Sequence, residues 1–98
     1  MNLYVIRRRT AWGSPAELQA AAEKSGRIGS EEMPDRVRWI RRYVVTEADG
    51  RLGTVCIYEA RDPESISEHA SRVDMPADEI VPILDTVVVR ADPAKAVR

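Results

Sequence analysis

The chain has 98 residues, of which 44% are hydrophobic and 32% are charged, with one cysteine and a formal net charge of −1. This length and composition predict one folded domain and exclude a second domain or a disordered chain, while the balanced charge argues against partners such as nucleic acid or an anionic membrane. The single cysteine excludes an intrachain disulfide and favours a cytoplasmic location, and no apolar run reaches the roughly 20 residues that a membrane-spanning helix needs.

The chain begins with a predicted strand and a predicted helix. Residues 3–6 are apolar in succession, which is typical of a strand buried on both faces, and we place this strand at residues 2–9. Residues 14–17 then combine a capping serine, a proline and a glutamate, which together mark a helix start. Gly26 and Gly29 are expected to end this helix, because glycine commonly terminates helices.

Two further strands are predicted to form a hairpin. Residues 36–46 alternate with a period of two, which predicts a strand with Trp39 and Tyr43 on the same face. An Asp-Gly pair at 49–50 is a strong signal for a tight turn between strands. The third strand is therefore expected at residues 53–60.

The last third of the chain predicts a second helix and a fourth strand. The Asp-Pro pair at 62–63 is a second helix start, and His69 falls on the apolar stripe of this helix. Residues 80–90 are expected to form the fourth strand, placed at an edge because a proline lies near its start. Residues 91–98 have no periodicity and are expected to be a loose tail.

This order of elements predicts an α+β fold over residues 1–90. Strand, helix, strand, strand, helix, strand is the ferredoxin-like βαββαβ sandwich, with a four-stranded antiparallel sheet and two helices on one face. The first and third strands are apolar on both faces, so the helices leave apolar side chains uncovered on the other face. We therefore expect a homodimer packed sheet to sheet, of the dimeric α+β barrel type.

Five short segments carry a family resemblance: Val37-Arg38-Trp39-Ile40, Tyr43-Val44, Cys56-Ile57-Tyr58-Glu59-Ala60, Glu68-His69-Ala70 and Pro76-Ala77-Asp78-Glu79-Ile80. In this order, residues 36–84 resemble a small ferredoxin-like family of largely unassigned function that includes an actinobacterial nickel-binding protein. The resemblance implies a dimeric fold and makes nickel a candidate cofactor. The family pattern usually has an acidic residue where this chain has Arg7, and a His-Ser pair where it has Arg41 and Arg42. These changes put cations at candidate ligand positions and argue against nickel binding.

His69 is the only histidine in the sequence, and it is the first candidate site residue. A histidine is suited to be a metal ligand or a general base, because its charge changes near neutral pH. The alternative is a core histidine satisfied by one hydrogen bond. A metal site would need further donors, for which the sequence offers Cys56, Glu59 and nearby carboxylates, or a site shared across a dimer.

The remaining candidates for ligand binding lie on the second and third predicted strands: Trp39, Tyr43, Cys56, Tyr58 and Glu59. The aromatic side chains could line a pocket, and packing in the core or at an interface is the alternative for each. A packing role is favoured for Cys56, since free cysteine is among the most buried residue types. A solvated carboxylate is the default for Glu59. No residue is assigned a catalytic role.

The leading functional hypothesis is a dimeric binding module for a metal ion or a small molecule, held near Tyr58 and His69. One alternative is a cofactor-free dimeric α+β barrel enzyme with His69 as general base, and another is a structural or protein-interaction module. A pocket of about 300 Å³ or more would favour an organic ligand over a purely structural role. A polar cluster around His69 without such a pocket would favour a metal.

Overall fold

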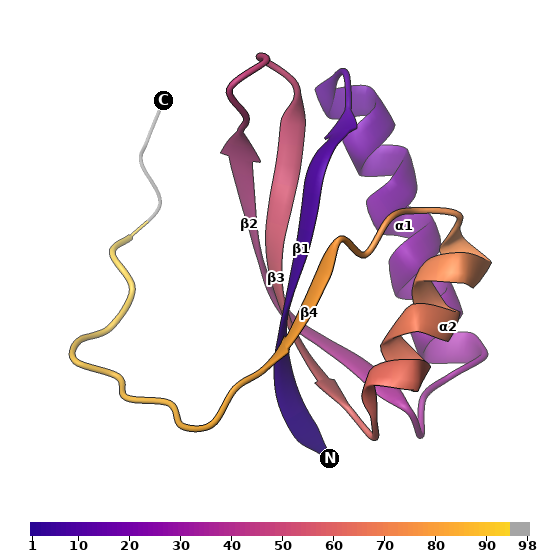
Figure 1. The fold of residues 1–98 in the computed structure, drawn as a ribbon, viewed down its shortest axis with the longest axis vertical. Helices are drawn as coiled ribbons and strands as arrows, with labels where there is room; N and C mark the ends of the chain where they lie inside the picture. The colour runs from indigo at the N-terminus through magenta and orange to yellow at the C-terminus, as the bar shows by residue number, and fades with distance from the viewer. Residues whose placement is uncertain (95–98) are drawn as a thin grey trace.

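A four-stranded antiparallel sheet with two helices on one face makes up the fold (Figure 1). The structure is a computed structural model that describes residues 1–94. Its elements are β1 (Asn2–Trp12), α1 (Pro15–Glu31), β2 (Val37–Thr46), β3 (Leu52–Ala60), α2 (Pro63–Val73) and β4 (Glu79–Pro82). The strand order β2-β3-β1-β4 confirms the predicted α+β ferredoxin-like fold. Within the described residues, no helix is long and apolar enough to cross a membrane.

Both helices begin where the capping signals predict. The Ser14 side chain accepts a hydrogen bond from the backbone N–H of Glu17 at 3.3 Å, and the Asp62 side chain does the same for Ser65 at 2.8 Å. The prediction that α1 ends at Gly26 or Gly29 is wrong, because the helix continues to Glu31. A helical glycine costs about 1 kcal/mol relative to alanine. Burial of the neighbouring apolar side chains against the sheet outweighs that cost.

The prediction that Trp39 and Tyr43 share a face is also wrong. In the ladder with β3, Trp39 is paired with Tyr58, but Arg41 is paired with Ile57. The residue between Trp39 and Arg41 is therefore an extra residue in β2, and such a bulge reverses the alternation of the side chains that follow it. Trp39 consequently lies on the helix-covered face of the sheet, and Tyr43 lies on the opposite face, which we call the open face.

The fourth strand is much shorter than predicted, since β4 spans Glu79–Pro82 and not residues 80–90. Its partner explains the difference: β4 pairs antiparallel with β1, and Tyr4 is opposite Pro82. The backbone N–H of Ile83 still donates to the Leu3 carbonyl of β1 at 2.9 Å. The residues after it pass the N-terminal end of β1, where no strand is left to pair with. The domain boundary near residue 90 stays a prediction, and residues 95–98 of the expected tail lie outside the described residues.

Side chains on the helix-covered face form the core. The register pairs Tyr4 with Tyr58, Ile6 with Cys56, and Arg8 with Thr54. All six of these side chains are buried beneath the two helices. The hydrophobic core consists of Tyr4, Ile6, Ile28, Met33, Val37, Cys56, Tyr58, Ala60, Ile66 and Val73. The helix-covered face therefore holds both the core and the buried polar residues from which a site can be built.

Candidate functional site

A cleft of about 490 Å³ lies beside α1 at the β2 edge of the sheet. Helix α1 opens this space because it presents small residues there; a side-chain carbon added at Gly26 would meet no atom within 4 Å. The same addition at Gly29 would lie 3.6 Å from Nε2 of His69, in ordinary contact. The residues that line the cleft are Ser25, Gly26, Gly29, Ser30, Pro34, Val37, Arg38, Trp39, Tyr58 and His69.

His69 reaches the cleft from α2 and is held by the backbone of α1. Its Nε2 lies 3.0 Å from the carbonyl oxygen of Ser25, which can only accept, so Nε2 carries the proton of the neutral ring. Nδ1 is then left with a lone pair, and it is buried without a hydrogen-bond partner among the described residues. Burial lowers the pKa of His69, and the positive charges of Arg8 and Arg72 lower it further. His69 is therefore a neutral imidazole at neutral pH.

Tyr58 forms the wall of the cleft next to His69. Its side chain is only 2% exposed, and its hydroxyl lies 3.2 Å from Oγ of Ser25. Its ring is stacked on Trp39 with 6.2 Å between ring centroids, and it contacts the His69 ring at 5.6 Å. Burial raises the pKa of the Tyr58 phenol, so the hydroxyl stays protonated and can donate or accept.

Three of the sequence candidates therefore come together, namely Trp39, Tyr58 and His69. Cys56 is buried on the same face as Tyr58, but it lines a second, smaller cavity and not the cleft. This placement agrees with the packing role favoured for the thiol. The binding roles assigned to all four residues stay predictions.

Tyr43 and Glu59 lie on the open face, away from the cleft. The Tyr43 hydroxyl accepts a hydrogen bond from Nη1 of Arg41 at 3.0 Å, and the side chain is 49% exposed. Glu59 forms an ion pair with Arg38 at 3.1 Å. Neither of these two residues lines the cleft.

Among residues 1–94, no three His, Cys, Asp or Glu side chains are close enough together to hold a metal ion. Of the extra donors that the sequence offered, Cys56 is buried in the core and Glu59 is on the opposite face from His69. The arrangement can bind an organic ligand through aromatic faces and hydrogen bonds, but it presents one imidazole nitrogen to a metal.

Two residues that shape this region were not singled out from the sequence. Ser25 organises both His69 and Tyr58, yet a serine within a helix gives no pattern that distinguishes it from a solvated one. Arg8 is 1% exposed on the helix-covered face. The alternation from Tyr4 and Ile6 places it there, but an arginine is rarely fully buried unless it is paired.

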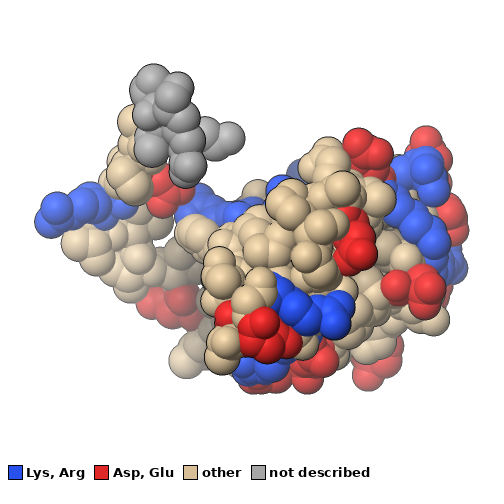
Figure 2. Space-filling view, turned by 90° about the horizontal axis from the view of Figure 1, so that it is seen from above, with Lys and Arg blue, Asp and Glu red and all other residues tan. Residues whose placement is uncertain are grey.

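Most other arginines of β1 and β2 are paired with carboxylates, as in Arg7 with Glu47, Arg9 with Glu79, Arg38 with Glu59 and Arg41 with Asp92. Basic and acidic side chains lie beside one another on the face that Figure 2 shows. These contacts agree with the balanced net charge of −1. The absence of nucleic-acid binding stays a prediction.

Comparisons with known proteins identify similar chains. A family model described as "Nickel responsive protein SCO4226-like" matches residues 4–83. The crystal structure of SCO4226 from Streptomyces coelicolor A3(2) superposes with a TM-score of 0.68 at 19% sequence identity, over 87% of this chain and 99% of that one. At this identity the superposition supports the fold alone. Among curated proteins, none matches this chain in sequence.

Proposed function

This chain belongs to the SCO4226-like family of nickel responsive proteins, and on that premise we propose that it is a small binding module for an organic molecule. The ligand occupies the cleft between α1 and β2. The observation that carries this proposal is the cleft volume of about 490 Å³, which falls within the range of about 300–1,000 Å³ that is usual for small-molecule sites. A purely structural module would have no need of such a space.

The chemistry of the lining indicates a planar ligand with at least one polar group. Trp39 is 37% exposed at the mouth of the cleft and offers a ring face for stacking. Ser30 and Arg38 also line the cleft, and side chains of these types can bind polar groups. Deeper in, the neutral ring of His69 lies against Gly29. A ligand that stacks on Trp39 can thus direct a polar group toward His69.

A substitution that fills the cleft tests this proposal. In Gly26→Leu the new side chain enters open space in the cleft, and the loss of a helical glycine favours the fold. Ala20→Leu is the matched control, since Ala20 is exposed on the same helix and does not line the cleft. Saturation-transfer NMR with a panel of small aromatic fragments, indole among them, measures binding.

We expect several fragments to bind the wild type and the Ala20→Leu control, and to lose about tenfold or more in affinity in Gly26→Leu. A wild-type protein that binds no fragment would contradict the proposal. Fragment affinities that are unchanged in Gly26→Leu would place binding elsewhere and contradict it as well.

A cofactor-free enzyme with His69 as general base is less well supported by the geometry. A general base must reach the proton that it removes and have a pKa near the working pH. Nδ1 of His69 is buried, Nε2 is engaged by the Ser25 carbonyl, and burial lowers the pKa of the ring. These observations favour a residue that orients a bound molecule over one that removes a proton.

Nickel is the second candidate ligand, favoured by the family description and by the unpartnered Nδ1 of His69. The residues present do not fit a nickel ion within one subunit, because residues 1–94 hold no three-donor cluster. The nearby charges of Arg8 and Arg72 disfavour a proton on His69 and would disfavour a metal cation in the same way. We therefore expect weak nickel binding or none.

Calorimetric titration at pH 7.5 measures the affinity for nickel of the wild type, His69→Ala and His69→Gln. Binding through the imidazole would weaken below about pH 6.5, where protons compete with the metal. Stoichiometric binding at micromolar affinity or tighter, lost in both variants, would show that His69 binds nickel despite the cations at Arg7, Arg41 and Arg42.

The open face supports a homodimer in which a second copy covers the sheet. Tyr43 is 49% exposed and Val81 is 47% exposed on this face. The arginines there already have carboxylate partners, so two such faces can meet without unpaired charge. Light scattering at micromolar concentration should give about twice the chain mass of 11.0 kDa. Tyr43→Lys should return the mass to that of one chain, and a wild-type monomer would contradict the dimer.

A further inference from the structure

Arg8 is a buried cation without a counter-ion. Its side chain is 1% exposed, and both Nε and Nη2 are buried without a hydrogen-bond partner among the described residues. The guanidinium carbon lies over the Tyr58 ring, 5.7 Å from the ring centroid. A contact with a ring does not replace the hydrogen bonds that the N–H groups of Nε and Nη2 lack.

Two other polar side chains have unpartnered atoms at the same place. Nη1 of Arg42 and Oγ1 of Thr54 are each buried without a partner among residues 1–94. Both residues and Arg8 line a cavity of about 20 Å³ on the helix-covered face, together with Trp12 and Tyr58. The residues that carry these four atoms, three of which belong to cations, therefore border one small space.

No aspartate or glutamate of the described residues lines this cavity or pairs with Arg8. A guanidinium keeps its charge throughout the physiological pH range, so Arg8 cannot become neutral to avoid the cost of burial. Burial of a charge is strongly unfavourable unless the charge is paired and hydrogen-bonded. A single water could satisfy one or two donors, but it would leave the buried charge of Arg8 uncompensated.

We propose that this cavity is an anion site that receives a compact monoanion, a carboxylate group or a halide, on Arg8, Arg42 and Thr54. Nε and Nη2 of Arg8 form the side-by-side donor pair that matches a carboxylate. A volume of about 20 Å³ holds one or two water-sized groups, which suits a carboxylate head or a chloride ion. Trp12 and Leu18 give the site apolar walls that strengthen the electrostatic attraction.

The anion site is distinct from the cleft but shares a wall with it. Ser25, Trp39 and Tyr58 line both spaces. The positive charge of Arg8 lowers the pKa of both Tyr58 and His69, although burial has the larger effect on each. A bound anion would offset that charge and so change the electrostatics of the cleft without entering it.

Thermal unfolding at constant ionic strength tests the proposal. The Tm is first measured with morpholinopropanesulfonate as the anion, which is too large for the cavity. It is then measured with acetate or chloride in place of that sulfonate. We expect the Tm of the wild type to rise by about 5 °C or more at a hundredfold excess over the Kd, and to saturate. The tighter of the two ions identifies the source, a carboxylate if acetate is tighter and a halide if chloride is tighter.

Arg8→Met keeps much of the side-chain length and removes the charge. This variant should lose the anion-dependent rise, and its Tm in sulfonate should equal or exceed that of the wild type, because an unpaired buried charge has gone. Arg9→Met is the control, since Arg9 is exposed and should leave the anion response intact. Gly26→Leu should also leave it intact, which separates this site from the proposed cleft function.

Two milder variants keep the proposal testable if Arg8→Met does not fold. Thr54→Val and Arg42→Gln each remove one donor and should weaken acetate or chloride binding several-fold. A purely structural role for Arg8 would instead lower the Tm of Arg8→Met equally in all three anions. That result, or a wild-type Tm that is the same in sulfonate, acetate and chloride, would overturn the anion site.

Discussion

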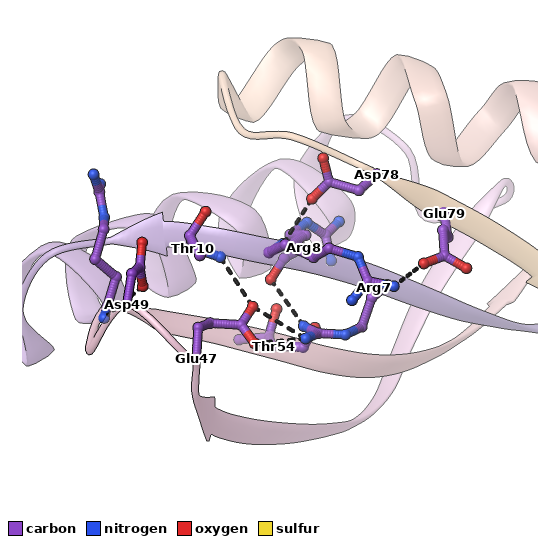
Figure 3. Close-up of polar contacts among 10 residues, drawn as sticks. Arg7, Arg8, Thr10, Glu47, Asp49, Thr54, Asp78 and Glu79 are labelled. Atoms are coloured by element: carbon purple, nitrogen blue, oxygen red, sulfur yellow. Dashed lines mark hydrogen bonds and ion pairs between the residues drawn. The ribbon is translucent and has the colours of Figure 1, made fainter.

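Arg7 and Arg8 are neighbours in sequence, yet β1 places their side chains on opposite faces of the sheet in very different surroundings. Arg7 donates through Nη2 to both carboxylate oxygens of Glu47, at 2.7 and 3.0 Å, as Figure 3 shows. Arg8 lies beneath the helices and has no carboxylate partner among the described residues. The open face therefore satisfies its charges within the chain, whereas the helix-covered face has donors available for a ligand.

The backbone of Thr10 and Gly53 packs closely around Glu47, the partner of Arg7 on the open face. Thr10 has a positive φ of 49°, and its backbone N–H donates to Glu47 at 3.0 Å. A side-chain carbon at Gly53 would lie 2.6 Å from the backbone oxygen of Arg8 and 2.3 Å from Glu47 Oε2, so only glycine fits there. The side chain of Arg8, by contrast, lies among residues that line a cavity.

The largest effect on the free energy of unfolding is expected when an isoleucine of the helix-covered face is truncated, and an isoleucine of the open face gives the comparison. Ile6 is fully buried beneath the helices and Ile57 is partly buried on the open face. Ile6→Ala should lower the free energy of unfolding by about 2–5 kcal/mol, and Ile57→Ala by about 1 kcal/mol at low protein concentration. Urea denaturation measures both values.

The two isoleucine variants should also differ in how their loss of stability depends on protein concentration. If a second copy covers the open face, the cost of Ile57→Ala should grow with protein concentration, and the cost of Ile6→Ala should not. Equal costs for the two variants at low concentration would contradict the assignment of a buried and an open face.

A smaller effect is expected at His69. His69→Ala should lower the free energy of unfolding by about 1–3 kcal/mol, through lost packing and the loss of the hydrogen bond to Ser25. His69→Gln, which retains a donor, should cost less. Urea denaturation of both variants at pH 7.5 gives these values.

The pH dependence of His69 has a definite sign. Burial lowers its pKa in the folded state, so on acidification the unfolded chain, with a pKa of about 6.5, takes up a proton first. The stability of the wild type should therefore be complete above about pH 7 and fall as the pH drops from about 6.5 toward 5. His69→Gln should lack this fall, and a wild-type stability that increases on acidification in this window would contradict a buried neutral ring.

The smallest effect is expected at Glu47, the carboxylate of the ion pair with Arg7 on the open face. The hydrogen bond from Arg7 holds the pKa of Glu47 below its usual value, and the backbone N–H of Thr10 adds to this effect. The contribution of Glu47 is therefore complete above about pH 5 and is lost as the pH falls through the lowered pKa. Glu47→Gln should flatten the decline in stability between about pH 5 and 3. Glu23→Gln, on the exposed side of α1, is the control and should leave the curve as in the wild type.

The order of the elements could be predicted because it depends on local signals. Ser14 and Asp62 cap the helices in the structure as in the sequence, and Gly50 adopts the positive φ of 85° that a tight turn requires. The errors arise where a partner strand decides the outcome. The extra residue in β2 depends on pairing with β3, and the early end of β4 depends on where β1 begins.

The candidate site could be predicted only in part. The spacing from Ile66 places His69 on the packed face of α2, and the alternation along β3 places Cys56 and Tyr58 together. The contact between Ser25 and both His69 and Tyr58 depends on how α1 crosses the sheet, which no local pattern encodes. The cleft itself depends on the helix continuing through its glycines, the feature that the sequence predicted wrongly.

The central claim is that the cleft beside α1 is where this protein binds its ligand. An amide-correlation NMR titration with the tightest-binding aromatic fragment tests it directly, with the amides of Gly26 and Gly29 and the Trp39 indole as cleft reporters and the amides of Ile57 and Val81 as open-face reporters. We expect saturable shifts at the cleft reporters and little change on the open face. Shifts confined to Ile57 and Val81, with the cleft signals unmoved, would contradict the account.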